Sequence, residues 1–171
     1  MIGWSGCPDA TAENPTVARG WQCALTVPRE LSMRDGKLCQ QPAHEIERMR
    51  GDCVRATGGE TVEEPGRLFD LVVSCEGAKM VELEIRKGVF VRYADGMLTL
   101  DMGDEGYGRD QRSIELSELR DLRVLSDTTM VEIFGNGGEA ALTSRTYSPA
   151  VPAMGLHAEG AASMDFYRLA H

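Results

Sequence analysis

The sequence has few aromatic residues, no long apolar run and no pattern of closely spaced cysteines. Aromatic residues make up 6% of its 171 positions. No apolar stretch approaches the ~18 residues that a membrane-spanning helix needs, so we expect no membrane partner. The first ten residues, MIGWSGCPDA, lack a basic stretch followed by an apolar one, and we expect no signal peptide there.

The cysteines are odd in number, and no two of them form a C-x-x-C pair. They are Cys7, Cys23, Cys39, Cys53 and Cys75. A disulfide framework and a zinc site both need paired cysteines at close, regular spacing. The pattern therefore predicts reduced thiols in a cytoplasmic protein, with no metal and no other cofactor.

The charge is strongly negative. The chain holds 27 acidic against 18 basic residues, a net charge of −9 at pH 7, and its sequence pI is about 4.8. An acidic protein is repelled by phosphate backbones and by anionic membrane surfaces, so we expect no nucleic-acid partner. A neutral sugar remains compatible with this charge. Hydrophobic residues make up 42% of the chain, which is enough for the core of one domain.

Residues 1–51 are predicted to form short strands, turns and one helix. An apolar run predicts a strand at 21–27, and Asp35-Gly36 is a two-residue hairpin signal between two further strands. Residues 42–50 are predicted to be a short helix, with Pro42 at its first position because proline has no N–H to leave unpaired there.

Residues 52–66 have no periodicity and contain glycine and proline, so they are interpreted as a linker. From residue 67 to 171 the pattern changes. Val81, Leu83 and Ile85 alternate with Glu82, Glu84 and Arg86, which is typical of strands with one buried face. Some ten such short strands, separated by turns, predict an all-β fold: a two-sheet antiparallel β-sandwich preceded by a strand and hairpin segment and one short helix.

The polar clusters have structural explanations at the level of sequence. Residues 44–48, HEIER, lack the second histidine of a zinc-protease helix and are interpreted as a solvated helix. Asp101, Asp104 and Glu105 lack the regular spacing of a calcium loop and are interpreted as an acidic hairpin loop. Glu132 lies inside a predicted strand, and we expect it on the solvated face because most carboxylates are exposed.

Two blocks resemble recurring stretches of glycoside hydrolase family 32, the β-fructofuranosidases that include sucrose-6-phosphate hydrolases, invertases, levanases and inulinases. Gly3-Trp4 and the block 20–42, which contains LTVPREL, resemble the stretch that closes the catalytic propeller. Residues 122–149, which contain VEIFGNGGE and TSR, resemble the signature of the C-terminal β-sandwich. The resemblance implies a C-terminal sandwich together with the last strands of a propeller.

The resemblance assigns structural roles to the residues that carry it. They are Trp4, Trp21, Pro28, Arg29, Glu30, Asp127, Glu132, Phe134, Asn136 and Arg145. Arg29-Glu30 marks the junction of propeller and sandwich, and we expect an ion pair or a strand-end cap there. The tryptophans are expected to pack. Gly135 replaces the family's usual apolar residue and is expected to weaken its strand, while Met102 replaces an arginine.

No catalytic residue is assigned. A retaining glycosidase needs two carboxylates about 5 Å apart. In the family these are the Asp of Asn-Asp-Pro-Asn-Gly and the Glu of a Glu-Cys pair, and the Asp of Arg-Asp-Pro holds the fructosyl ring. None of the three motifs occurs in this sequence. The resemblance therefore implies a detached, non-catalytic module with a structural, docking or self-association role.

Alternative functions remain open at this stage. A fructan- or carbohydrate-binding module would stack aromatic rings on sugars, and the candidates are Phe90, Tyr93, Tyr107 and Tyr147. The chain could also complement a separate propeller chain in an active β-fructosidase, or be a small independent hydrolase. The expected partners are a propeller chain, a second copy through the propeller-like strands or the sandwich edge, and fructan or sucrose. Residues 1–39 are expected to fold back on the sandwich or to pair between chains.

Overall fold

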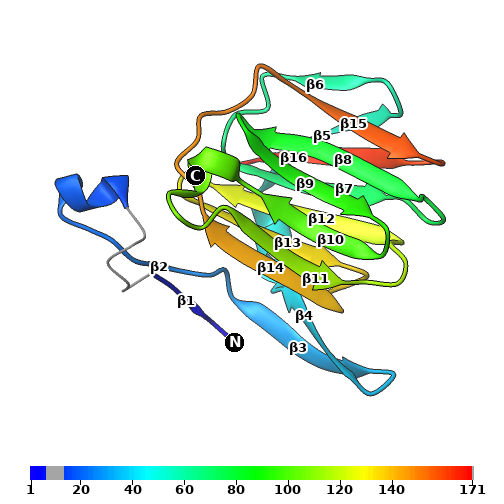
Figure 1. Ribbon diagram of the computed structural model, residues 1–171, viewed down its shortest axis with the longest axis horizontal. Helices are drawn as coiled ribbons and strands as arrows, with labels where there is room; N and C mark the ends of the chain where they lie inside the picture. Colours follow the sequence, from blue (N-terminus) through cyan, green and yellow to red (C-terminus); the bar gives the residue numbers. More distant parts are fainter. Residues whose placement is uncertain (7–13, 171) are drawn as a thin grey trace.

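The main body of the protein is a sandwich of two six-stranded antiparallel sheets, and a separate N-terminal segment runs along one side of it (Figure 1). The computed structural model describes residues 1–6 and 14–170. Within these ranges, no helix is both long enough and apolar enough to cross a membrane. The predicted two-sheet sandwich is confirmed.

Sheet one has the strand order β11-β10-β9-β8-β15-β6. Its strands are β6 (Thr61–Glu63), β8 (Met80–Arg86), β9 (Val89–Ala94), β10 (Met97–Asp101), β11 (Gln111–Glu115) and β15 (Ala153–Glu159). The predicted alternation is confirmed through Ile85, but a register shift follows Glu84, so that Ile85 and Arg86 are both buried. The expectation that Arg86 points outward is therefore wrong, because a bulge places two successive side chains on one face.

Sheet two has the order β14-β13-β12-β7-β16-β5. Its strands are β5 (Arg50–Thr57), β7 (Phe69–Ser74), β12 (Asp121–Asp127), β13 (Met130–Gly135), β14 (Ala140–Arg145) and β16 (Ser163–Leu169). Gly135 ends β13 and pairs with both neighbouring strands, with Leu122 on β12 and with Ala140 on β14. A Cβ there would lie 3.2 Å from Leu98 and 3.3 Å from Leu116, so the missing side chain lets the two sheets approach closely.

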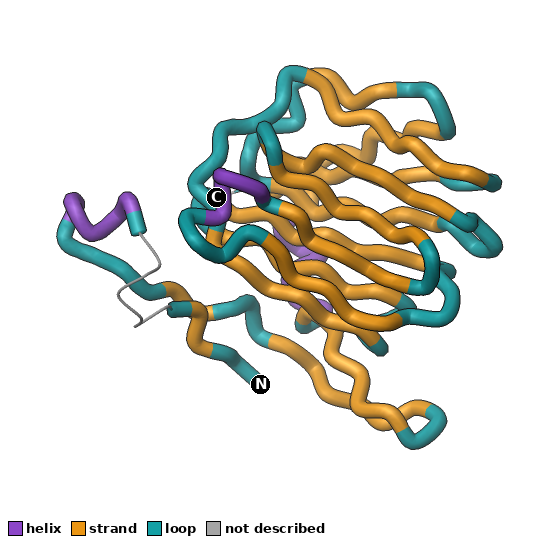
Figure 2. The backbone as a smooth tube through the Cα atoms, in the orientation of Figure 1, coloured by secondary structure: helices purple, strands orange, loops and turns teal. Residues whose placement is uncertain are grey.

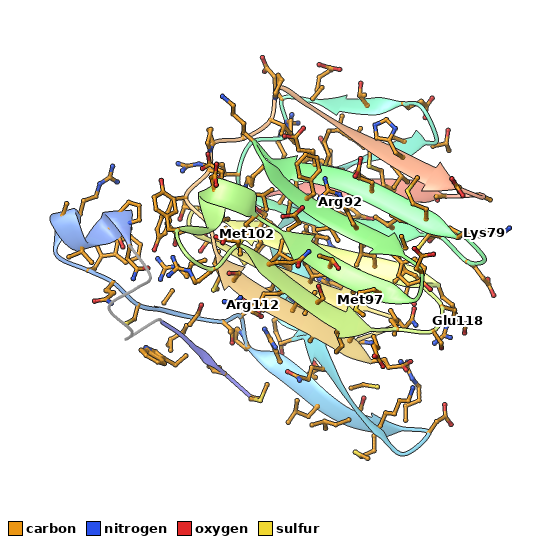
Figure 3. All side chains as sticks on the ribbon, in the orientation of Figure 1. Lys79, Arg92, Met97, Met102, Arg112 and Glu118 are labelled. Atoms are coloured by element: carbon orange, nitrogen blue, oxygen red, sulfur yellow. The ribbon has the colours of Figure 1, made fainter. Side chains whose placement is uncertain are left out.

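The core lies between the two sheets. Leu83, Leu100 and Ile133 are fully buried, and the rings of Phe69 and Phe166 lie 5.4 Å apart. Burying one such side chain contributes roughly 1.5–3 kcal/mol. Met102 is also fully buried, beside the 3-10 helix η3 (Gly103–Gly106), where Figure 3 labels it. The family's arginine at this position is thus replaced by a side chain that suits an apolar interior.

The N-terminal segment comprises two small antiparallel pairs outside the sandwich (Figure 2). Its elements are β1 (Trp4–Ser5), the 3-10 helix η1 (Pro15–Arg19), β2 (Ala24–Leu25), β3 (Arg29–Arg34) and β4 (Lys37–Pro42). The predicted hairpin is confirmed, with Asp35 and Gly36 at φ 51° and 76° in the turn. The strand predicted at 21–27 is shorter, because only β2 pairs with β1.

The short helix predicted at residues 42–50 is present, but its bounds are narrower than predicted. A 3-10 helix, η2, covers His44–Met49, while Pro42 ends β4 opposite Arg29. Proline has no N–H to donate, and the end of a strand tolerates that loss as well as a helix start does. Pro42 was therefore compatible with either a helix start or a strand end, and the pairing of β3 with β4 determined that it ends a strand.

The linker predicted at residues 52–66 is also wrong. Residues 50–57 and 61–63 form β5 and β6, which pair with β16 and β15 at the edges of the two sheets. Ala56 is the buried residue of β5 and Val62 that of β6. Edge strands that bury so little apolar surface are polar in sequence, and they resemble linkers for that reason. The sandwich therefore begins at Arg50.

Candidate functional site

A buried ion pair joins the N-terminal segment to the sandwich. The Arg29 guanidinium lies 2.5 Å from Glu132 Oε2, and the two side chains are 8% and 2% exposed. Val27 N–H donates to the other carboxylate oxygen of Glu132 at 2.7 Å. The expected ion pair at Arg29 is confirmed. The solvated position expected for Glu132 is wrong, because the N-terminal segment covers the outer face of β13.

Arg29 has further partners on both sides of the junction. It donates to Gln40 Oε1 at 2.9 Å and to Thr143 Oγ1 at 2.6 Å, and its guanidinium lies 5.0 Å from the ring centroid of Phe134. Sequence reasoning did not assign Gln40 or Thr143. The TSR motif contains Thr143, and this residue pairs with Glu132 across β13 and β14, so the motif was the sequence signal that could have identified Thr143.

The hairpin β3–β4 folds back on the turn between β13 and β14. Gln40 N–H donates to Gly138 O at 2.9 Å, and Gln41 Nε2 donates to Gly137 O at 2.7 Å. Asn136 holds this turn in place with its side chain, which accepts from Arg120 N–H at 2.8 Å and donates to Glu118 O at 2.9 Å. The prediction that this segment folds back on the sandwich is confirmed for the hairpin.

Charged side chains reinforce the same contact. Arg34 donates to the Asn136 carbonyl, and Lys37 forms an ion pair with Glu139. The Lys37 hydrogen bond is the main cause that lowers the pKa of Glu139 below its ordinary value. The turn written GNGGE in the sequence is thus a platform on which the hairpin rests.

Arg145 holds the chain that leads into β2. Its guanidinium donates to Thr129 O at 2.9 Å and to Gln22 O at 3.0 Å. The ring of Trp21 lies 5.2 Å from the same group, and the ring of Tyr147 lies 5.4 Å from it. Arginine binds carbonyl oxygens with its edge and aromatic rings with its face, so one side chain organises both segments.

The remaining family-motif residues have local roles. Asp127 Oδ1 accepts from Thr128 N–H at 2.5 Å in the turn that follows β12, and Pro28 O accepts from Ala43 N–H at 2.8 Å. Trp4 does not pack as expected, since 59% of its surface is exposed. Its exposure belongs to a larger pattern.

The N-terminal segment carries most of the exposed apolar surface. Among the residues that the structure describes, ten of the twelve exposed large hydrophobic residues lie between residues 1 and 49. We call these ten the N-terminal apolar face: Met1, Ile2, Trp4, Val17, Trp21, Leu25, Leu31, Met33, Leu38 and Met49. The concentration of such residues on one segment is typical of an interaction surface.

An apolar groove lies between this segment and sheet two. Its volume is about 320 Å³, and Leu25, Val27, Met49, Leu125 and Met130 are among the residues that line it. These side chains come from β2, η2, β12 and β13 and from the connection after β2. The groove therefore exists only because the N-terminal segment is held against the sandwich.

The four aromatic sugar-binding candidates do not form one stacking platform. Tyr93 is 5% exposed and belongs to the core, so that prediction is wrong for Tyr93. Phe90 lies on the opposite face of β9, with the Arg92 guanidinium 4.1 Å from its ring centroid. Tyr107 and Tyr147 contact each other edge to face at 5.7 Å, and Tyr147 donates to Asn14 Oδ1 at 2.9 Å.

Glu30, His44 and Glu45 bring two carboxylates and an imidazole together, with ligand atoms within 4.8 Å of one another. All three side chains are exposed. The His44 hydrogen bond is the main cause that lowers the pKa of Glu30, and the same bond raises the pKa of His44. A general acid needs a raised carboxyl pKa, so the environment of Glu30 acts against that role. The arrangement is a surface ion pair at the end of the hairpin.

Comparison with known families gives two matches, one at the N-terminal end of the chain and one in its C-terminal half. The family model described as "Glycosyl hydrolases family 32 C terminal" matches residues 82–169. The model described as "Glycosyl hydrolases family 32 N-terminal domain" matches residues 1–42. The first match falls within the sandwich, and the second ends with β4, at the end of the hairpin.

Curated relatives match across most of the chain. The chain is 37% identical over 168 residues to raffinose invertase of Escherichia coli, a match that covers 88% of this chain and 34% of the relative. It is 31% identical over 160 residues to sucrose-6-phosphate hydrolase of Salmonella typhimurium, a match that covers 88% of this chain and 32% of the relative. The chain thus spans about a third of the length of these relatives.

Solved structures agree in fold. The sucrose-6-phosphate hydrolase from Lactobacillus gasseri superposes with a TM-score of 0.83 at 20% identity, over 99% of this chain and 38% of that one. The exo-inulinase from Aspergillus awamori superposes with a TM-score of 0.77 at 21% identity, over 99% of this chain and 40% of that one. Both matches include the N-terminal segment as well as the sandwich.

Proposed function

The chain belongs to glycoside hydrolase family 32, and from that premise we propose that it provides the non-catalytic sandwich and the closing strands that dock onto a catalytic β-propeller. The observation that carries the proposal is the N-terminal apolar face. Of the twelve exposed large hydrophobic residues in the described ranges, nine lie within residues 1–42, the stretch that matches the family's N-terminal domain, and Met49 lies in η2 shortly after it.

The buried junction supports a docking role. Arg29, Glu132 and Thr143 hold the segment to sheet two, and the β13–β14 turn holds the hairpin. A surface that is held rigidly before binding loses less conformational entropy when the partner arrives. The junction therefore keeps the apolar face in a defined orientation.

We assign no step of hydrolysis to this chain. The family's three catalytic motifs are not in its sequence, and the paired carboxylates Glu30 and Glu45 are exposed at the surface. The relatives' names point to hydrolysis of a β-fructoside such as sucrose or its 6-phosphate. In our proposal that activity resides in the propeller, and this chain stabilises it.

We further propose a cytoplasmic location. Each of the four cysteines in the described ranges carries a free thiol. Burial raises the pKa of the Cys75 thiol to about 11, so that thiol stays protonated and unreactive at neutral pH. Free thiols persist in a reducing compartment, which is the basis for this assignment.

The proposal is tested by mixing the purified chain with the propeller domain of a sucrose-6-phosphate hydrolase relative, produced without its own sandwich. Sedimentation should show an equimolar complex, and sucrose hydrolysis by the propeller should survive heating longer in the complex than alone. The chain alone should hydrolyse no sucrose.

A matched pair of variants identifies the surface. Met33→Asp together with Leu38→Asp places two charges on the apolar face and should abolish the complex. Val54→Asp changes an exposed hydrophobic residue on β5, outside that face, and should leave the complex intact. Equal effects of both changes, or self-association of the chain without any propeller complex, would contradict the proposal.

A further inference from the structure

A second, polar pocket of about 240 Å³ lies on the side of the N-terminal segment that faces β14 and β11. Four arginines line it: Arg29, Arg109, Arg112 and Arg145. The other lining residues include Trp4 from β1 and Ser144 from β14. This concentration of guanidinium groups occurs in a chain whose net charge is −9.

Two of these arginines, Arg112 and Arg145, carry charge that no carboxylate among the described residues balances. Arg29 is paired with Glu132. Arg145 donates to three neutral oxygens, which are Thr129 O, Thr129 Oγ1 and Gln22 O. Arg112 donates to its neighbour's carbonyl, Gln111 O, at 2.8 Å. Within residues 1–6 and 14–170, neither Arg112 nor Arg145 has a carboxylate partner.

Burial makes this imbalance costly. Arg145 is 3% exposed and Ser144 is 4% exposed. The Ser144 hydroxyl is buried and has no hydrogen-bond partner among the described residues. Burying a cation without a counter-charge is destabilising, and so is burying a hydroxyl without a hydrogen-bond partner. An anion bound between Arg145 and Ser144 would balance the charge of Arg145, and it can also accept a hydrogen bond from the Ser144 hydroxyl.

We propose that this pocket binds a small oxyanion, either a carboxylate or a phosphate group. The planar guanidinium has five N–H donors in a fork that fits two oxygens of such a group at once. Arg145 has two donors left after its three hydrogen bonds, and Arg112, which is exposed, also lines the pocket. All the described residues that line the pocket belong to this chain, so binding can be measured on the isolated chain without the docked domain.

The test is calorimetric titration of the intact chain with inorganic phosphate, and separately with acetate, in a buffer of low ionic strength. We expect saturable binding with a dissociation constant of about 1 mM, weakening as salt is added because screening reduces attraction between partly exposed charges. Absence of saturable heat with both anions would overturn the proposal.

Matched variants locate the site. Arg112→Ala should weaken binding about tenfold, the usual effect of losing one charge-assisted hydrogen bond. Arg112→Lys should give an intermediate value, because it keeps the charge without the fork. Lys79→Ala removes the same charge at the far end of the sandwich, where Figure 3 labels Lys79 well away from Arg112, and should change nothing. Equal loss in Arg112→Ala and Lys79→Ala would mean general attraction only and would overturn the site.

A final titration distinguishes the two sources of the oxyanion. Phosphate is titrated into the complex of the chain with the propeller domain of the relative. Loss of phosphate binding would identify a carboxylate of the docked domain as the occupant. Retained binding would identify a free anion. Both results keep the pocket, and the experiment on the isolated chain stands even where no complex forms.

Discussion

At the scale of single residues, the buried pair of Arg29 and Glu132 shows how a charge can fix the position of a segment. Removing two charges from water is unfavourable, and their mutual attraction offsets this only where the geometry is good and the other hydrogen-bonding groups are satisfied. Here both carboxylate oxygens accept hydrogen bonds, and the guanidinium also reaches Gln40 and Thr143. The segment therefore has one favourable position on sheet two.

We predict that Glu132→Leu lowers the free energy of unfolding by about 3–5 kcal/mol, because it leaves the Arg29 charge buried without a partner. Urea denaturation measures this loss. The double change Arg29→Met with Glu132→Leu should be less destabilising than the single one, because it removes both charges.

The exposed pair of Arg55 and Asp165 provides the control. Arg55 is 71% exposed, and Asp165→Ala should change stability far less than Glu132→Leu, because water screens an exposed pair. If Glu132→Leu were no more destabilising than Asp165→Ala, the structural importance of the buried pair would be wrong.

At the scale of elements, the hairpin β3–β4 and the β13–β14 turn depend on each other. Gly138 has φ +86°, and a Cβ added there would lie 1.9 Å from Gln40 O. Position 138 therefore requires glycine for two reasons: its backbone angle is one that other residues rarely adopt, and the hairpin lies too close to leave room for a Cβ. The short GNGGE motif determines where a separate element rests.

We predict that Gly138→Ala displaces the hairpin and lowers stability by about 2–4 kcal/mol, because a backbone angle that disfavours alanine is combined with a clash against backbone. Gly36→Ala is the matched control. Gly36 has φ +76°, and nothing lies within 4 Å of its added Cβ, so about 1–2 kcal/mol is expected there.

Amide hydrogen exchange separates the two effects. In Gly138→Ala the Gln40 amide, which donates to Gly138 O, should lose its protection, while amides of β8 and β9 keep theirs. Unchanged protection of Gln40 would show that the turn does not hold the hairpin.

At the scale of the whole molecule, Arg86 connects the two sheets through the interior. It lies on β8 of sheet one and donates to Ser126 Oγ on β12 of sheet two at 2.7 Å and to Arg67 O at 2.8 Å. It also reaches the carbonyls of Asp127 and Ser148. Burial lowers its pKa to about 10, which still leaves it charged at neutral pH.

We predict that Arg86→Lys lowers the free energy of unfolding by about 3 kcal/mol, because a lysine ammonium cannot reach all of these acceptors and leaves buried oxygens without donors. The urea midpoint should fall while the slope of the transition stays the same, since the fold is kept. Arg92→Lys, on the solvated face of β9, is the control and should have little effect. A midpoint for Arg86→Lys equal to that of the control would contradict the role given to Arg86.

The sequence by itself determined the sandwich, the hairpin turn and the family. Alternating apolar residues and turn signals act over a few neighbouring positions, so they are visible without any tertiary information. The PREL and VEIF motifs also identified Arg29 and Glu132 as residues to examine. The strands β5 and β6 were not predicted from the sequence. Each lies at the edge of a sheet and has a neighbouring strand on one side only, so its residues are mostly polar, and only the complete sheet shows that position.

Only the tertiary structure decided which polar residues are buried and what they contact. Glu132 alternates along its strand with the apolar residues Val131 and Ile133, as a solvated residue does, yet a segment more than 100 positions away in the sequence covers it. Arg86 turns inward through a bulge, and Tyr93 is part of the core rather than a sugar platform. Burial and charge balance are properties of everything that packs around a residue. The apolar face and the arginine pocket therefore became visible only when the N-terminal segment was in place against the sandwich.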